Sequence, residues 1–279
     1  MKRRTVFLTL SLVLAIGMAG IVAEPLVLLG LGMTRHSPCS AGEALRGLDN
    51  EREIAEIAAD FAKRSKAVER DSAGYTRWEG PRGTWWAPTK SEGLLFFQQA
   101  GQEKKLFGTG ARGARAGDVV LDAGAGTGIY TREALSLGAK LVIAIESAPD
   151  LLECLRRNFK AEIVSGRVVV VDKGVRDEEL AAGAKWPVTT IDRIVAELKL
   201  PAVDFVKLDL EGGEARAISG ARNTLARFKP RVSVCIRHSG MDRETVPKSI
   251  QAARPDYSGE GGFCQLGDGN IWPTVLYFR

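Results

Sequence analysis

The run Asp-Val-Val-Leu-Asp-Ala-Gly-Ala-Gly-Thr-Gly, residues 118–128, decides the fold. It is typical of a buried strand that ends in an acid, Asp122, and then turns through a glycine loop into a helix. The loop glycines are Gly124, Gly126 and Gly128. A dinucleotide-binding loop, G-x-G-x-x-G, needs its third glycine where Ile129 stands. The loop therefore predicts a nucleoside-type ligand at the carboxyl end of the first strand of a doubly wound sheet, and it disfavours NAD.

Short apolar runs alternate with helical stretches after Gly117, as in βα units around a parallel sheet. The predicted strands are 118–122, 141–146, 167–172, 203–209 and 232–237, and the predicted helices lie near 127–138, 149–159, 188–198 and 212–228. The final residues, 263–279, predict a hairpin that turns between Gly267 and Asn270. The expected fold class is α/β, with a mostly parallel doubly wound sheet and a C-terminal antiparallel hairpin.

Acidic residues end three successive predicted strands. Glu146 ends the second strand, 24 residues after Asp122, which suits a carboxylate that accepts hydrogen bonds from ribose hydroxyls. Asp172 ends the third, where it could accept a hydrogen bond from the amino group of an adenine. An acidic edge favours a cationic nucleoside ligand such as S-adenosylmethionine over a pyrophosphate. Taken singly, each acid also fits a solvated strand end or a helix cap.

A second motif follows at residues 190–238. It comprises Thr190-Ile191-Asp192, then Lys207-Leu208-Asp209-Leu210-Glu211-Gly212-Gly213-Glu214, then Gly220-Ala221 and Pro230. Together with the glycine loop, this pattern resembles the FkbM-type methyltransferase family from about Trp85 to the C-terminus. The resemblance implies a Rossmann-like S-adenosylmethionine-dependent methyltransferase, commonly one that acts on a hydroxyl oxygen. The glycine loop and the acidic strand ends together predict cofactor contacts for Asp122, Gly124, Gly126, Gly128, Glu146 and Asp172.

The second motif also supplies candidate catalytic groups. Methyl transfer needs an aligned nucleophile, and a hydroxyl nucleophile must lose its proton to a general base. Asp209, Glu211 and His238 lie at the ends of the last two predicted parallel strands and are the candidates. Glu214 is weighed evenly between this role and a helix N-terminal charge, whereas Lys207 on its own reads as a surface ion pair.

The N-terminus predicts a membrane anchor. Residues 5–23 contain no charged side chain, and Lys2, Arg3 and Arg4 precede them. Cleavage as a signal peptide after Ala23 is the alternative. The basic flank predicts that the rest of the chain lies across the membrane, although S-adenosylmethionine is made in the cytoplasm, so the orientation stays open. We therefore divide the chain into an anchor (1–33), an amphipathic helical segment with a linker (34–84) and a catalytic domain (85–279).

Composition limits the other possibilities. Of 279 residues, 45% are hydrophobic, and 39 basic against 34 acidic residues leave a net charge of only +5, which does not favour nucleic-acid binding. The four cysteines, Cys39, Cys154, Cys235 and Cys264, are widely spaced and accompany only two histidines. This arrangement predicts neither a zinc site nor disulfides. Three tryptophans, Trp78, Trp85 and Trp86, are expected to form a satellite core rather than a substrate cleft.

The acceptor is not specified by any motif. The resemblance and the predicted anchor favour a hydroxyl on a carbohydrate, a glycolipid or another small hydroxylated molecule. A nucleotide-dependent oxidoreductase on the same sheet, and an inactive membrane-anchored scaffold, are the alternative functions.

Overall fold

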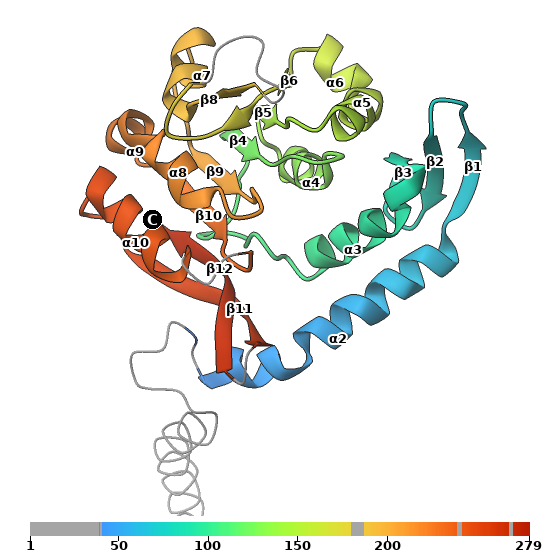
Figure 1. The fold of residues 1–279 in the computed structure, drawn as a ribbon, viewed down its shortest axis with the longest axis horizontal. Helices are drawn as coiled ribbons and strands as arrows, with labels where there is room; N and C mark the ends of the chain where they lie inside the picture. Colours follow the sequence, from blue (N-terminus) through green and yellow to red (C-terminus); the bar gives the residue numbers. More distant parts are fainter. Residues whose placement is uncertain (1–38, 40, 180–186, 239–241, 268–269) are drawn as a thin grey trace, which may run out of the picture.

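The computed structural model describes residues 39, 41–179, 187–238, 242–267 and 270–279. Figure 1 shows one central sheet flanked by helices, with a long helix, α2 (Ala41–Arg64), running along the edge of the fold. The sheet has seven strands in the order β11-β12-β10-β9-β4-β5-β6. Its strands are β4 (Val119–Ala123), β5 (Leu141–Ile145), β6 (Val168–Val171), β9 (Phe205–Leu208), β10 (Arg231–Cys235), β11 (Gly259–Gly267) and β12 (Asn270–Phe278).

The sheet is parallel from β6 to β10, and β12 pairs antiparallel with both β10 and β11. These pairings confirm the predicted α/β fold with its C-terminal hairpin. The chain order reverses at β4, which lies between β5 and β9. The carboxyl ends of β4 and β9 therefore flank the position where ligands of doubly wound sheets bind.

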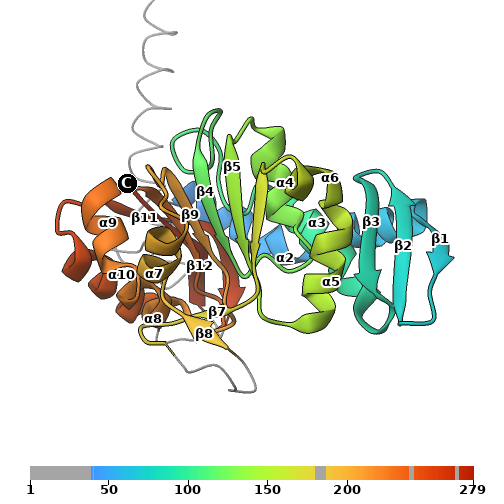
Figure 2. The same cartoon turned by 90° about the horizontal axis from the view of Figure 1, so that it is seen from above.

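Helices cover both faces of the sheet (Figure 2). They are α3 (Glu92–Glu103), α4 (Ile129–Ser136), α5 (Pro149–Asn158), α6 (Lys160–Val164), α7 (Ile191–Glu197), α8 (Glu214–Ser219), α9 (Arg222–Phe228) and α10 (Asp242–Ala253). Alternate residues of β4 enter opposite cores: Leu121 packs in the core that contains Ile191 and Ile218, and Val120 packs in the core that contains Phe96 and Tyr130. Burial on both faces explains why the strands read as continuous apolar runs.

The observed helices differ from the predicted ones in several places, and α3 and α6 were not predicted. The predicted helix at 212–228 is broken at Gly220, because a side chain there would stand 2.0 Å from the carbonyl oxygen of Arg176 and the backbone has to pass close by. Helix α10 was not predicted, since its sequence includes Pro247 and few apolar residues. The predicted helix near 188–198 is wrong at its start, because β8 (Val188–Thr189) pairs there in parallel with β7 (Gly174–Val175), and helix α7 begins only at Ile191.

The N-terminal segment is only partly helical. Within the segment 34–84, predicted as amphipathic helix and linker, the helix ends at Arg64 and β1 (Lys66–Arg70) follows. It pairs with β2 (Tyr75–Gly80), which pairs with β3 (Gly83–Pro88). This small sheet packs against α5 and buries Trp85, while Trp78 contacts Phe96 edge to face. The tryptophans Trp78 and Trp85 thus belong to a core, as expected.

Helix α2 is fixed to β11 at Cys264. A side chain at Gly47 would stand 2.6 Å from the Cys264 carbonyl oxygen, so glycine allows the helix and the strand to touch. Asn50 donates a hydrogen bond of 2.9 Å to the same carbonyl. Cys39 and Cys264 form a disulfide, which corrects the prediction of unpaired cysteines. The pairing joins residues 225 positions apart, and sequence spacing alone cannot reveal such a contact. Cys154 and Cys235 are buried free thiols.

Loss of the disulfide is expected to weaken the fold. The double variant Cys39→Ser/Cys264→Ser should lose about 2–4 kcal/mol of unfolding free energy, because the bond restricts the unfolded chain. Urea unfolding of the oxidised protein and the variant, each with and without reductant, measures this loss. Reductant should shift only the parent protein, and equal midpoints for oxidised parent and variant would contradict the prediction.

No helix within the described residues has the length and apolarity to cross a membrane. The predicted anchor, residues 1–33, lies outside the described residues.

Candidate functional site

The glycine loop follows β4 in an unusual backbone conformation. Gly124, Gly126 and Gly128 have φ angles of +73°, +58° and +94°. A side chain at Gly124 would stand 2.0 Å from the carbonyl oxygen of Asp209, and one at Gly128 would stand 2.1 Å from the Phe159 ring. By contrast, the nearest atom to a side chain at Gly126 is Nε2 of Gln98, at 3.6 Å. The loop is therefore packed on one side and open toward α3 on the other.

A buried ion pair between Asp122 and Lys207 lies beneath the glycine loop, on the side that faces the sheet. Asp122 has no exposed surface, and its carboxylate lies 3.1 Å from the Lys207 amine and accepts a 2.7 Å hydrogen bond from Thr131. Lys207 also donates to the Gly124 carbonyl at 2.6 Å. Burial opposes the charge on Lys207, but Asp122 and Asp209 outweigh it and raise its pKa. Lys207 is thus part of the interior, which corrects its interpretation as a surface ion pair. Asp122 acts on the loop rather than facing solvent.

Glu146 fastens the loop to the second strand end. Its Oε2 accepts a 2.9 Å hydrogen bond from the Gly126 amide, and its Oε1 accepts bonds from the amides of Ser147 and Ala148, each 2.8 Å. A carboxylate has about four acceptor positions. One position on Oε2 is left for a ligand hydroxyl.

Asp172 lies at the end of the third strand, β6, where the sequence predicted it. Its side chain is 63% exposed and lies 3.4 Å from Arg156 on α5. Such an exposed pair restrains the carboxylate weakly. Asp172 is thus accessible to a ligand that extends from Glu146 along the strand ends.

Asp209 and His238 form the centre of the candidate catalytic group. Nε2 of His238 lies 3.0 Å from Oδ1 of Asp209. Burial alone would raise the pKa of Asp209, but the bond to His238 and the nearby Lys207 lower it to about 2. The same bond raises the pKa of His238. Asp209 is therefore ionised at neutral pH, and His238 binds a proton more readily than a free histidine.

The thiol of Cys235 completes a group of possible metal ligands with Asp209 and His238, whose ligand atoms lie within 4.8 Å of one another. Burial raises the pKa of this thiol far above its usual range.

The two glutamates of the second motif have different environments. Glu214 is fully buried and accepts hydrogen bonds from the amides of Leu210 (2.7 Å) and Gly212 (3.0 Å), so it shapes the loop after β9. Burial raises its pKa. Glu211 is exposed, with a φ of +54°, and does not line the cavity beside Asp209. The structure thus brings Asp209 and His238 together and leaves Glu211 outside the cavity.

A cavity of about 40 Å³ lies between the glycine loop and the α2–α3–β11 wall. The ends of β4 and β9 supply Gly124, Lys207 and Asp209. The lining also includes aromatic and amide side chains, Phe97, Gln98, Gln102, Phe107, Tyr130, Phe263 and Gln265, together with Arg237 and Thr274. Sequence reasoning missed this wall because most of its members lie outside both motifs. The amides of α3, set in an otherwise apolar helix, were the available signal.

The N-terminal β2–β3 hairpin is connected to the glycine loop through Asn158 of α5. Asn158 donates hydrogen bonds to the carbonyl of Trp86 (3.1 Å) and to that of Thr127 (2.9 Å) and accepts one from the Trp86 amide (2.7 Å). One side chain therefore connects β3 to the glycine loop, which gives the hairpin a positioning role.

The family model and the curated relative that match this chain are both described as methyltransferases. The family described as "Methyltransferase FkbM domain" matches residues 122–253. The chain is 28% identical over 165 residues to a ribosomal protein L11 methyltransferase of Sorangium cellulosum, covering 58% of this chain and 48% of that protein. The chain thus spans about half the length of this curated relative.

Two solved structures of methyltransferases superpose partly on this chain at low identity. A methyltransferase FkbM from Methylobacillus flagellatus superposes with a TM-score of 0.49 and 19% identity, covering 82% of this chain and 59% of that one. A precorrin-6Y C5,15-methyltransferase from Geobacter metallireducens superposes with a TM-score of 0.39 and 19% identity, covering 59% and 79%.

Proposed function

Residues 122–253 belong to the FkbM methyltransferase family, and from this premise we propose that the protein transfers a methyl group from S-adenosylmethionine to a hydroxyl oxygen of a carbohydrate or glycolipid. One observation carries the proposal: Asp209, paired with His238, lines a cavity directly beside the glycine loop. A proton-accepting pair therefore lies where the loop would present a bound cofactor.

The residues fit this cofactor. The loop is open at Gly126, Glu146 keeps an acceptor position for a ribose hydroxyl, and Asp172 is exposed for an adenine amino group. Gly124 and Gly128 allow the close packing that forms the loop. When bound, S-adenosylmethionine supplies a methyl group on a sulfonium centre.

The spacing of the loop argues against a nicotinamide cofactor. Ile129 occupies the place of the third glycine of a dinucleotide-binding loop, and its side chain is buried at the start of α4. A pyrophosphate would also meet the carboxylates of Glu146 and Asp209 at this edge. Titration with NAD, as a competitor of S-adenosylmethionine, tests this rival. An inactive scaffold would bind neither molecule.

Asp209 and His238 can remove the acceptor proton. Asp209 is ionised and lines the cavity, so it can hold an acceptor hydroxyl by a hydrogen bond. With His238 neutral, the pair has room for one more proton and titrates as a unit. Gln98, Gln102 and the aromatic side chains around the cavity suit the hydroxyls and the apolar ring faces of a carbohydrate.

Glu146→Ala is expected to weaken S-adenosylmethionine binding by about 10–100-fold. The variant loses a hydrogen bond between the ligand and a charged group, and it loses the bond from the Gly126 amide that orders the loop. Calorimetric titration of the parent and the variant measures this. Glu244→Ala is the matched control, since Glu244 is 80% exposed on α10. Equal affinities for Glu146→Ala and the parent would contradict the assignment.

The pH dependence of turnover is expected to report His238. Asp209 raises the pKa of His238 above its ordinary 6.5, with Glu214 acting in the same direction and Arg237 against it. An imidazolium cannot accept a proton, so activity should be low below this raised pKa and should rise as pH increases through it. A pH–rate profile measures the rise, and His238→Gln should remove it. A profile that falls over this range, or is unchanged in the variant, would contradict the role.

The predicted anchor favours a membrane-linked acceptor. We propose that the catalytic domain lies across the membrane from the basic flank of that anchor. The Cys39–Cys264 disulfide agrees with this side, because disulfides persist in oxidising compartments. Protease protection in sealed vesicles tests the orientation: digestion from the cytoplasmic side would contradict it.

A further inference from the structure

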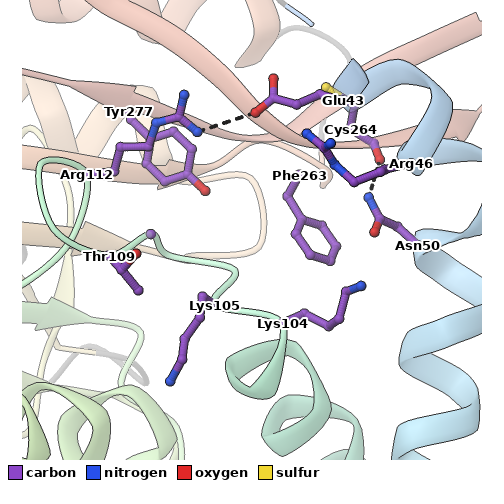
Figure 3. Close-up of a pocket in the computed structure, with 11 residues that line it drawn as sticks. Glu43, Arg46, Asn50, Lys104, Lys105, Thr109, Arg112, Phe263, Cys264 and Tyr277 are labelled. Atoms are coloured by element: carbon purple, nitrogen blue, oxygen red, sulfur yellow. Dashed lines mark hydrogen bonds and ion pairs between the residues drawn. The ribbon is translucent and has the colours of Figure 1, made fainter. Parts of the chain in front are cut away.

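A second and larger cavity adjoins the proposed active site. It has a volume of about 340 Å³, at the lower end of the range for small-molecule sites. Figure 3 shows it between α2, the loop after α3, and β11. Four cations, Arg46, Lys104, Lys105 and Arg112, line it together with a single carboxylate, Glu43.

The two cavities share a wall. Phe263 lines both, and its φ of +51° is rare for a bulky residue. Asn50 lines the larger cavity and Ile54, one helical turn further along α2, lines the smaller one. The two cavities therefore lie on either side of Phe263, and a molecule seated in the larger one is a neighbour of the cavity that Asp209 lines.

The cations keep hydrogen-bonding capacity for a ligand. Arg112 bonds Glu260 at 2.8 Å and Glu43 at 3.3 Å, and Lys104 pairs with Glu53. A guanidinium has five donors and an ammonium three, so neither group is saturated. Lys105 pairs with Glu133 at 2.6 Å, and Figure 3 shows its amine pointing away from Arg46.

Arg46 differs from the other three cations of this cavity, which are each paired with a carboxylate. It is exposed on α2, and no acidic side chain among the described residues pairs with it. Figure 3 shows the ring of Phe263 between Arg46 and Lys104. An arginine and a lysine on either side of an aromatic ring are donors suited to a phosphate group attached to an organic moiety.

We infer that this cavity binds a phosphate or pyrophosphate group of the methyl acceptor, so that the acceptor is a phosphorylated hydroxyl compound. The inference rests on the proposed function, whose active site it extends. The phosphate occupies the cluster around Arg46, and the hydroxyl to be methylated lies beyond Phe263 at Asp209. The phosphate source is either a lipid headgroup or a soluble phosphate ester. Helix α2 begins eight residues after the predicted anchor, and an extended chain of that length spans at most about 28 Å. The cavity is therefore close enough to a membrane for a lipid headgroup to enter it, and a soluble ester needs no such proximity.

The test is calorimetric titration of the full-length, oxidised chain with inorganic pyrophosphate. Arg46→Ala is expected to weaken binding by about tenfold, as for a lost charged hydrogen bond, and Arg46→Glu should abolish it. Lys63→Ala is the matched control, because Lys63 is an exposed cation near the other end of α2. No binding of pyrophosphate, or equal loss in the Arg46 and Lys63 variants, would overturn the inference.

Two further arms complete the test. Phosphatidylcholine vesicles with phosphatidic acid, but not vesicles without it, should displace pyrophosphate if the source is a lipid headgroup; displacement by glycerol 3-phosphate alone identifies a soluble ester. S-adenosylmethionine is titrated into the same samples. If S-adenosylmethionine binds and pyrophosphate does not, the phosphate site is wrong and the proposed function stands. If S-adenosylmethionine does not bind, the proposed function itself is wrong.

Discussion

Asp209→Asn is expected to slow methyl transfer by about 10²–10⁴-fold, the usual contribution of a positioned general base. The asparagine keeps the shape of the side chain but removes the carboxylate that holds the acceptor hydroxyl and that raises the pKa of His238. S-adenosylmethionine affinity should be unchanged, because Glu146 and the glycine loop are untouched. Transfer of a labelled methyl group to the acceptor-containing membrane fraction measures the rate, and calorimetry measures the affinity.

Two companion variants sharpen this experiment. Glu244→Gln, on the exposed face of α10, should leave the rate unchanged. Glu211→Gln tests the other carboxylate candidate and should leave the rate unchanged, because Glu211 lies outside the cavity. A loss of rate as large as that of Asp209→Asn would instead make Glu211 the general base. An unchanged rate for Asp209→Asn would remove Asp209 from the catalytic group.

Lys207→Met is expected to lower the unfolding free energy by about 3–5 kcal/mol, because it leaves the Asp122 carboxylate buried without its charged partner. The same change removes the bond to the Gly124 carbonyl, so the glycine loop should also lose order. Urea unfolding measures the stability. S-adenosylmethionine affinity, measured where the variant is folded, reports the loop.

A charge-neutral pair provides the control for this variant. Asp122→Asn/Lys207→Met should be more stable than Lys207→Met alone, since no buried charge is then left unpaired. Arg64→Met removes an exposed partner of Asp60 on α2 and should cost less than about 1 kcal/mol. If Lys207→Met proves as mild as Arg64→Met, the pair does not support the loop.

The sheet and the cofactor edge were predictable because their signals are local. Parallel strands buried on both faces read as unbroken apolar runs, and the glycine loop directly follows one of them. The acids Asp122, Glu146 and Asp172 then had to share one edge. What spacing did not reveal is which acids face a ligand: Asp122 is enclosed by Lys207 and Thr131, whereas Asp172 is exposed.

The rest depends on contacts between distant parts of the chain. Cys39 meets Cys264 only because α2 lies against β11, and the cavity wall combines Ile54, Gln98 and Phe263 from three elements. The pairing of β1 with β2 similarly overrides the helical pattern after Arg64. None of these contacts has a signature within a short window of sequence.

The contact between α2 and β11 also imposes an order on biosynthesis. Helix α2 is complete at Arg64, but β11 begins only at Gly259, so at ordinary elongation rates α2 waits about 10–40 s for its partner. During that interval Cys39 can encounter Cys154 and Cys235, which are made earlier than Cys264. Both end up buried in the finished sheet and its helices. Rapid closure of the βα units on the nascent chain would thus hide Cys154 before Cys264 leaves the ribosome, whereas Cys235 is covered only when β12 pairs with β10.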